Sequence, residues 1–190
     1  PDNLGALRNY GAGVSNNSIA SSVTLTGNTS IGTNSRYDFV TGIAVNGGEF
    51  TLTKKGTGET WWAPNAGATI GSIIVEAGRF GVQSTDNLGS LAHSITVKPG
   101  AMLSSYAANS NAKPIILQGG MLHNNSGGTV VGTAGTWNGT LTLEGSGISN
   151  RIDSFGGPIV LNGKVTGPGG FEQLSTGGTK YRVDLSNADN

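Results

Sequence analysis

The fold is decided by the stretch Ile73–Val82 (IIVEAGRFGV), in which a short apolar strand, a glycine turn and a second short strand follow one another. The same order of elements recurs along the chain, in Ile43–Leu52 (IAVNGGEFTL), Ile95–Leu103 (ITVKPGAML) and Ile115–Leu122 (IILQGGML). Weaker copies are Leu141–Gly145 (LTLEG) and Ile159–Val165 (IVLNGKV). Repetition at roughly 20–30 residues is typical of solenoids, in which each unit buries its apolar face only against its neighbours. The sequence therefore predicts a repeat architecture.

The composition is unusual for a globular domain. Only 35% of the residues are hydrophobic and 12% are charged, while 33 of the 190 residues are glycine. Such a chain resembles a flexible linker in overall composition. Its apolar residues, however, gather in short runs bounded by turn residues, as ordered strands require.

The repeat predicts an all-β parallel β-helix of about 8–9 coils. We expect one solenoid over residues 1–190, with an irregular start at 1–22 and regular coils at 23–190, as a fragment of a longer repeat protein. The polar stretches 54–69, 104–113 and 123–139 are interpreted as loops. Asn-Gly pairs at 46–47 and 162–163 are hairpin signals, which leaves an antiparallel β-sandwich or jelly roll as the alternative.

Two longer phrases also recur. Ser35–Gly47 (SRYDFVTGIAVNG) is echoed by Asn150–Gly163 (NRIDSFGGPIVLNG), and Asp2–Leu7 (DNLGAL) is echoed by Asp86–Leu91 (DNLGSL). These echoes predict a super-repeat of roughly 100 residues above the coil period.

Several classes of protein are disfavoured. The chain has no cysteine, which excludes a disulfide framework, a thiolate metal site and a cysteine nucleophile. Its net charge is zero and its only adjacent basic pair is Lys54-Lys55, which argues against nucleic-acid binding. No apolar run approaches the length of a membrane span, so we expect no membrane insertion by this segment. Because it begins with Pro1, we expect a processed chain or a piece of a larger one.

The phrase Ser72–Gly89 (SIIVEAGRFGVQSTDNLG) resembles the autotransporter-associated β-strand repeat, which reads approximately T-x-V-x-A-G-T-L-x-V-x-x-x-x-A-L-G. The glycine-rich segment 167–190 is similar to the preceding part of that repeat. Arg79 in place of a small polar residue departs from the pattern. The resemblance implies a right-handed parallel β-helix in a long secreted or surface-displayed bacterial protein, without catalytic residues to carry over.

Few residues suggest chemistry. Glu49, Glu76 and Glu144 are candidates for the paired carboxylates with which some β-helix enzymes cleave polysaccharides, and Glu49 and Glu76 flank turns that the repeat makes equivalent. His93 and His123 lie beside strands without a second ligand at metal spacing, so we expect no metal site and no cofactor.

Tryptophan provides the best candidates for a binding surface. Trp61, Trp62 and Trp137 lie in stretches interpreted as loops, where an aromatic ring can stack on a sugar or on a protein partner. In the alternative interpretation, one member of an adjacent pair fills the coil interior and the other covers it.

Together these features predict a non-enzymatic structural segment of a secreted or cell-surface bacterial protein: a stalk, an adhesin scaffold or a fibre subunit. A chain without capping elements predicts self-association, with coil ends stacked head to tail. The alternative is a polysaccharide-degrading or glycan-binding β-helix of the tailspike or lyase kind.

Overall fold

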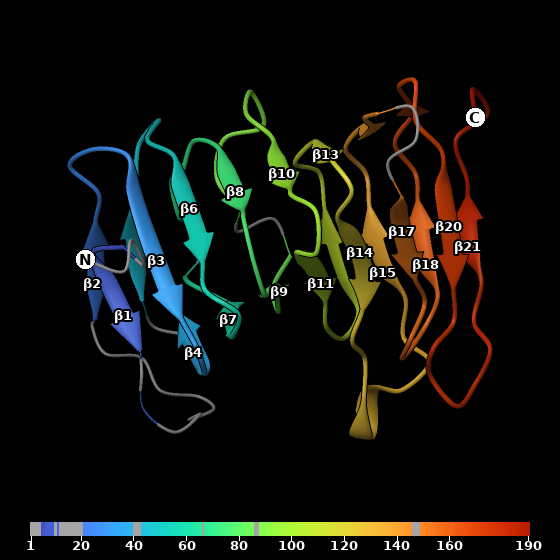
Figure 1. The fold of residues 1–190 in the computed structure, drawn as a ribbon, viewed down its shortest axis with the longest axis horizontal. Helices are drawn as coiled ribbons and strands as arrows, with labels where there is room; N and C mark the ends of the chain where they lie inside the picture. The colour runs from blue at the N-terminus through green and yellow to red at the C-terminus, as the bar shows by residue number, and fades with distance from the viewer. Residues whose placement is uncertain are drawn as a thin grey trace.

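The chain folds as a parallel β-solenoid, in which the backbone winds in successive coils about one axis (Figure 1). Its strands follow one another along this axis, from β1 (Leu7–Asn9) and β2 (Ser22–Thr24) at one end to β21 (Val183–Leu185) at the other. The structure is a computed structural model that describes residues 5–9, 11, 21–39, 43–65, 67–85, 88–145 and 149–190.

Three walls enclose the core. Sheet A joins β1 to β3 (Thr29–Thr33), β6 (Leu52–Lys55), β8 (Ile73–Val75), β10 (Ile95–Val97), β13 (Ile115–Leu117), β16 (Leu141–Leu143) and β19 (Val165–Thr166). Sheet C consists of β4 (Arg36–Phe39), β7 (Glu59–Trp62), β9 (Arg79–Val82), β11 (Met102–Ser105), β14 (Met121–Asn124), β17 (Asn150–Asp153) and β20 (Phe171–Leu174). The third wall comprises sheet B, which pairs β2 with β5 (Ala44–Asn46), and sheet D, which joins β12 (Asn109–Asn111), β15 (Gly135–Trp137), β18 (Ile159–Leu161) and β21.

Each coil visits the walls in a fixed order. In the coil that begins at β13, the chain runs from sheet A to β14 in sheet C, then to β15 in the third wall, and returns to sheet A at β16. Helix is limited, in the described part of the chain, to the short 3-10 turn η1 (Gly128–Val130). All strand pairs between described residues are parallel, which excludes the antiparallel sandwich.

The core consists of columns of stacked side chains. Ile73 pairs with Ile95, Ile95 with Ile115, and Ile115 with Leu141, and these four side chains are almost fully buried. Because side chains alternate along a strand, the first and third residues of each triplet face inward while the middle one faces out. Removal of this apolar surface from water stabilises the fold by about 1.5–3 kcal/mol for each fully buried aliphatic side chain.

The number of coils is smaller than the 8–9 expected from the sequence. Sheet C has seven strands among the described residues, which corresponds to about seven turns. The reason is a variable coil length: Ile115 follows its partner Ile95 after twenty positions, whereas Leu141 follows Ile115 after twenty-six. The longer coils accommodate loops beyond sheet C, such as the one that contains η1.

Two copies of the repeated phrase occupy a different wall from the others. The strands of Ile43–Leu52 and Ile159–Val165 that precede Asn-Gly are β5 and β18 in the third wall, whereas β8, β10, β13 and β16 belong to sheet A. Both Asn-Gly pairs therefore lie at corners rather than in hairpins. The Asn162 side chain donates to Oδ1 of Asn138 in the preceding coil (2.8 Å), which links two corners across the coil interface.

The echo between Ser35–Gly47 and Asn150–Gly163 has a structural basis. Both phrases run from sheet C to the third wall, from β4 to β5 and from β17 to β18. The second echo cannot be compared throughout, because residues 1–4 and 86–87 lie outside the described ranges.

Three stretches interpreted as loops contain strands. Strands β6 and β7 occupy most of 54–62, β12 lies within 104–113, and β15 lies within 123–139. In these strands, polar residues and tryptophan stand at positions where the other copies carry aliphatic residues, so the apolar pattern does not mark them. Of the start at 1–22, which we expect to be irregular, the structure describes residues 5–9, 11 and 21–22, and within them β1 pairs with β3 in sheet A.

The columns predict the effect of a truncation in a central coil. Ile95→Ala should lower the free energy of unfolding by about 2–5 kcal/mol, because its side chain is fully buried and leaves a cavity. Thr96→Ala, which changes the outward-facing neighbour in β10, should change it by no more than about 0.5 kcal/mol. Urea unfolding followed by circular dichroism measures both values, and equal losses would contradict the inward orientation of Ile95.

Candidate functional site: the outer face of sheet C

The outer face of sheet C carries most of the solenoid's clustered polar and aromatic side chains. Strand pairing aligns one outward row across six coils, and its members are Asp38, Trp61, Gly81, Ser104, His123 and Asp153. Although these positions alternate with core positions, the side chains of Asp38, Trp61, Ser104, His123 and Asp153 are buried. A row of buried polar side chains on an outer face is a candidate site for chemistry.

Trp61 is held between two arginines. The guanidinium carbons of Arg36 and Arg79 lie 5.5 Å and 5.9 Å from the centre of its ring, within the range of cation–π attraction. Its indole Nε1 donates to Oε2 of Glu59 (3.0 Å), and Tyr106 meets the ring edge-on at 5.8 Å. The side chain is only 2% exposed.

The charges around Trp61 cancel in pairs. Arg36 donates to both carboxylate oxygens of Asp38, with the shorter contact at 2.8 Å, and Arg79 donates to Oε1 of Glu59 at 2.9 Å. Both arginines are therefore occupied by carboxylates in this structure. The cluster braces neighbouring coils and offers little to an anionic or sugar ligand.

A glycine makes room for the Trp61 ring. Gly81 lies beside Trp61 in the next coil, and a Cβ atom added to it would lie 2.1 Å from Cε3 of the indole. Only a residue without a side chain fits at such a distance. The conformation of Trp61 thus depends on glycine at position 81.

Trp62 and Trp137 point to the core. Both are 1% exposed and belong to the main apolar cluster, where Trp62 contacts Phe39 and Phe80. Within the pair Trp61-Trp62, one ring fills the interior and the other covers the outside, as the alternative interpretation proposed. The expected loop position of all three tryptophans is wrong, since they lie in β7 and β15, and their burial leaves no ring face open for stacking on a sugar.

Further along the same row lie a serine, a histidine and an aspartate. Ser104 Oγ is 3.1 Å from Nδ1 of His123, and Nε2 of His123 is 3.9 Å from Oδ2 of Asp153, which is too long for a hydrogen bond. Asp153 instead accepts hydrogen bonds from the backbone N–H (3.1 Å) and hydroxyl (2.6 Å) of Thr176. The three residue types are those of a hydrolase triad, but the distance between His123 and Asp153 is too long for one.

The environment of His123 also disfavours catalysis. Burial, reinforced by the positive charge of Arg79, lowers the pKa of His123 to about 4, against the opposing effect of Asp153 and Glu59. An imidazole with such a pKa is a poor general base near neutral pH. Ser104 is fully buried and the Phe155 ring stacks on His123 at 5.5 Å, so no substrate reaches the serine in this structure.

The candidate carboxylates are spread over different corners. Glu49 lies in the turn between the third wall and sheet A, whereas Glu76 and Glu144 lie between sheets A and C, so the turns of Glu49 and Glu76 are not equivalent. The reason is that the first strand of Ile43–Leu52 lies in the third wall, although its residues resemble the phrases that begin in sheet A.

Glu76 and Glu144 share a corner but not a site. Lys98 and Gln118 lie between them on the intervening coils, and Gln118 donates to the Glu144 carboxylate. Three coil steps of about 4.8 Å separate their backbones by roughly 14 Å. Glycoside hydrolysis needs two carboxyl groups at about 5–9.5 Å, so this pair does not meet the requirement.

His93 lies beside Glu49, at a different corner from Glu76 and Glu144. Its Nε2 contacts the exposed carboxylate of Glu49, and its Nδ1 lies 3.5 Å from Oγ of Ser72. In the described ranges, no three His, Asp or Glu side chains come together in a way that could hold a metal ion.

Lys54 is a buried lysine that the sequence analysis did not identify as an interior residue. Lys54 faces inward from β6 and is 0% exposed, and its Nζ donates to the carbonyls of Lys55 (2.9 Å), Gly56 (2.8 Å) and Ala77 (3.1 Å). Burial lowers the pKa of Lys54 to about 8, and Glu59 partly opposes this shift. The alternation of Leu52 and Lys54 along the strand was the signal that could have revealed it.

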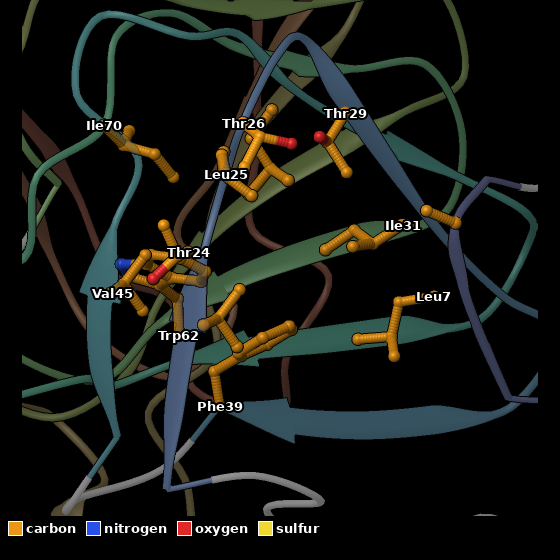
Figure 2. A pocket seen from close by; sticks show the side chains of 13 residues that line it. Leu7, Thr24, Leu25, Thr26, Thr29, Ile31, Phe39, Val45, Trp62 and Ile70 are labelled. Atoms are coloured by element: carbon orange, nitrogen blue, oxygen red, sulfur yellow. The ribbon is translucent and has the colours of Figure 1, made fainter.

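An apolar pocket lies at the N-terminal end of the described solenoid. It measures about 340 Å³, and Figure 2 shows its lining side chains converging from all three walls. Leu7 and Ile31 come from sheet A, Phe39 from sheet C, and Val45 from the third wall.

The chain was compared with protein-family models, with curated proteins and with solved structures, and no match was found. No helix in the described residues is long and apolar enough to cross a bilayer. Functional conclusions therefore depend on the geometry of the solenoid.

The contact between Gly81 and Trp61 can be tested with a double-mutant cycle. Gly81→Ala should destabilise the protein by about 1–3 kcal/mol, because the new methyl group overlaps the indole. The same change in a Trp61→Ala background should cost much less, since the ring is gone. Thermal and urea unfolding give the four free energies, and purely additive effects would show that the ring does not lie over Gly81.

The buried imidazole predicts a dependence of stability on pH. The pKa of His123 is about 4 in the folded state and about 6.5 unfolded, so between these values the unfolded chain binds more protons and stability falls as pH decreases. From pH 7 to pH 4, the free energy of unfolding of the wild type should fall by on the order of 3 kcal/mol more than that of His123→Gln. The variant lacks the buried imidazole that causes this dependence. The same comparison in a His93→Gln background removes the other histidine, and urea unfolding between pH 7 and pH 4 should still show the difference that His123 causes.

Proposed function

We propose that this chain is a non-enzymatic structural segment of a secreted or cell-surface bacterial protein, in which it acts as a rigid stalk or adhesin scaffold. The observation that carries the proposal is the continuity of sheet A, whose eight strands in the described part of the chain pair without interruption. Seven interstrand spacings of about 4.8 Å give a rod segment roughly 34 Å long. Residues that face the interior bind neighbouring coils together along the whole length.

Several further features support a structural role. The corner between sheets A and C carries polar side chains that bond from coil to coil, as Lys55 does with Glu76 (3.6 Å) and Lys98 with Gln118 (2.5 Å). The outer face of sheet C is braced by Trp61 and its two arginines. Secretion and bacterial origin are supported by the resemblance of Ser72–Gly89 to the autotransporter-associated repeat and agree with the absence of cysteine.

A structural rod should respond to tension in units of one coil. A chain stretched between its ends in single-molecule force spectroscopy should keep its folded length and then extend in steps. Each coil of about 22 residues should release roughly 75 Å of contour length. Smooth extension from the lowest forces, without steps, would argue against a load-bearing role.

The polysaccharide-cleaving alternative can be tested directly. Because Glu49, Glu76 and Glu144 do not converge, we expect the protein to release no oligosaccharides from a panel of bacterial and plant polysaccharides. The triple variant Glu49→Ala/Glu76→Ala/Glu144→Ala should behave identically. Release of reducing ends by the parent, lost in the triple variant, would overturn the non-enzymatic proposal.

A further inference from the structure

Both methionines of the chain lie on adjacent strands of the outer face of sheet C. Met102 in β11 pairs with Met121 in β14, and these strands follow β9 near the middle of the long axis (Figure 1). Each methionine is partly exposed, whereas the residue after it, Leu103 or Leu122, is fully buried. Because side chains alternate along a strand, the two thioethers face outward.

The row that contains these methionines is otherwise charged. In register from β4 to β20, its members are Arg36, Glu59, Arg79, Met102, Met121, Arg151 and Glu172. The arginines on either side of the methionines are paired with carboxylates, Arg79 with Glu59 at 2.9 Å and Arg151 with Glu172 at 3.6 Å. The methionine pair is therefore a neutral interruption, flanked by two guanidinium groups.

One of these arginines contacts a methionine sulfur. Nε of Arg79 donates to Sδ of Met102 in the next coil (3.3 Å), while its Nη1 donates to Glu59. A thioether sulfur is a weak hydrogen-bond acceptor, so the guanidinium group gains little from this contact. An oxygen atom carried by that sulfur would be a better acceptor, and hydrogen bonds from charged donors are the stronger ones.

A small pocket gives a reagent access to the pair. It measures about 90 Å³ and is lined by both methionines, by Arg151 and by small corner residues that include Gly119 and Gly120. About 10–15 Å³ suffices to hold a water molecule, so the pocket admits hydrogen peroxide, which is little larger. Since the chain has no cysteine, the two thioethers are its only sulfur groups.

We propose that Met102 is a site of oxidation by hydrogen peroxide, and that Arg79 holds the resulting sulfoxide. A lone pair of Sδ forms a bond to one peroxide oxygen, the O–O bond breaks, and the leaving hydroxide takes the proton of the transferred oxygen to become water. Sulfur loses two electrons, and the peroxide gains them. Because negative charge develops on the peroxide oxygens, the guanidinium group beside Sδ stabilises the transition state. Methionine sulfoxide reductases convert such a product back to the thioether.

The position of Met102 changes the usual consequence of methionine oxidation. A sulfoxide within a core disrupts packing, because it places a polar group among apolar ones. On the outer face, the new oxygen instead accepts a hydrogen bond from Arg79 and links β11 to β9. Oxidation of Met102 therefore strengthens the contact between two coils. This inference goes beyond the proposed structural role and does not require it.

A soft metal ion is the other partner that two thioethers attract, since thioethers favour Cu(I). The Nε–H of Arg79 already points at Sδ of Met102. A positively charged donor at this sulfur repels a cation and attracts an oxygen that carries partial negative charge. The contacts thus favour oxidation over metal binding.

Two variants make each methionine the only one in the chain. Met121→Leu leaves Met102, and Met102→Leu leaves Met121, so the gain of one oxygen atom in intact-protein mass spectrometry reports a single site. In hydrogen peroxide, Met102 should be oxidised about fivefold faster than Met121, because a charged donor stabilises its transition state. The two rates should become equal in concentrated urea, where the contact is lost. Equal rates in the folded proteins would overturn the proposal.

Arg79→Lys separates the effect of the hydrogen bond from that of exposure. Introduced into both single-methionine variants, it keeps a positive charge beside Glu59 but removes the Nε donor, so the two oxidation rates should become equal. Arg151→Lys is the matched control, since it changes the arginine on the other side of the pair, and it should leave the rate difference intact. A difference that survives Arg79→Lys would show that exposure alone determines the rates.

Urea unfolding tests the oxidised product. Met121→Leu that has been oxidised at Met102 should unfold at a higher urea concentration than the same variant before oxidation, because the sulfoxide gains a bond to Arg79 only in the folded state. A lower midpoint would overturn the role assigned to Arg79. Native mass spectrometry with Ag(I) addresses the metal alternative. One silver ion retained by the wild type, and lost in either methionine variant, would identify the pair as a soft-metal site instead.

Discussion

Parallel pairing between equivalent positions of successive coils is the constraint on which the structure depends. Pairing places Ile95 directly between Ile73 and Ile115, and the same alignment buries all three side chains. Hydrogen bonding and burial therefore specify one register together, because a slip by one residue would turn every column outward. A chain with few apolar residues can fold in this way, since each new coil uses the previous one as its core.

The same constraint determines where polar groups go. Lys54 occupies an interior position of sheet A, and its ammonium group is tolerated because three turn carbonyls accept its hydrogen bonds. On the outer face of sheet C, Trp61, Ser104, His123 and Asp153 align because their strands are in register. Their proximity follows from stacking, and their distances and burial fit a structural row better than a catalytic one.

Stacking also explains the character of the ends. An interior residue is covered only when a coil lies on each side of it, so the last copy of every column is exposed whatever its residue type. Leu161 and Leu185 show this effect in adjacent coils of one wall.

The sequence by itself determined the class of fold and many of its strands. Apolar triplets separated by glycine turns specify short strands and corners locally, and Gly78, with a φ of +65°, marks such a corner in the stretch that repeats most clearly. The wall to which each triplet belongs could not be read in this way, because β5 and β8 look alike and differ only in their neighbours. Tertiary structure alone decided that Trp61 covers Gly81, that His123 lies between Ser104 and Asp153, and that an apolar cavity exists at one end. The physical reason is that these contacts join residues about twenty to thirty positions apart, so they depend on the length of each intervening coil rather than on any local pattern.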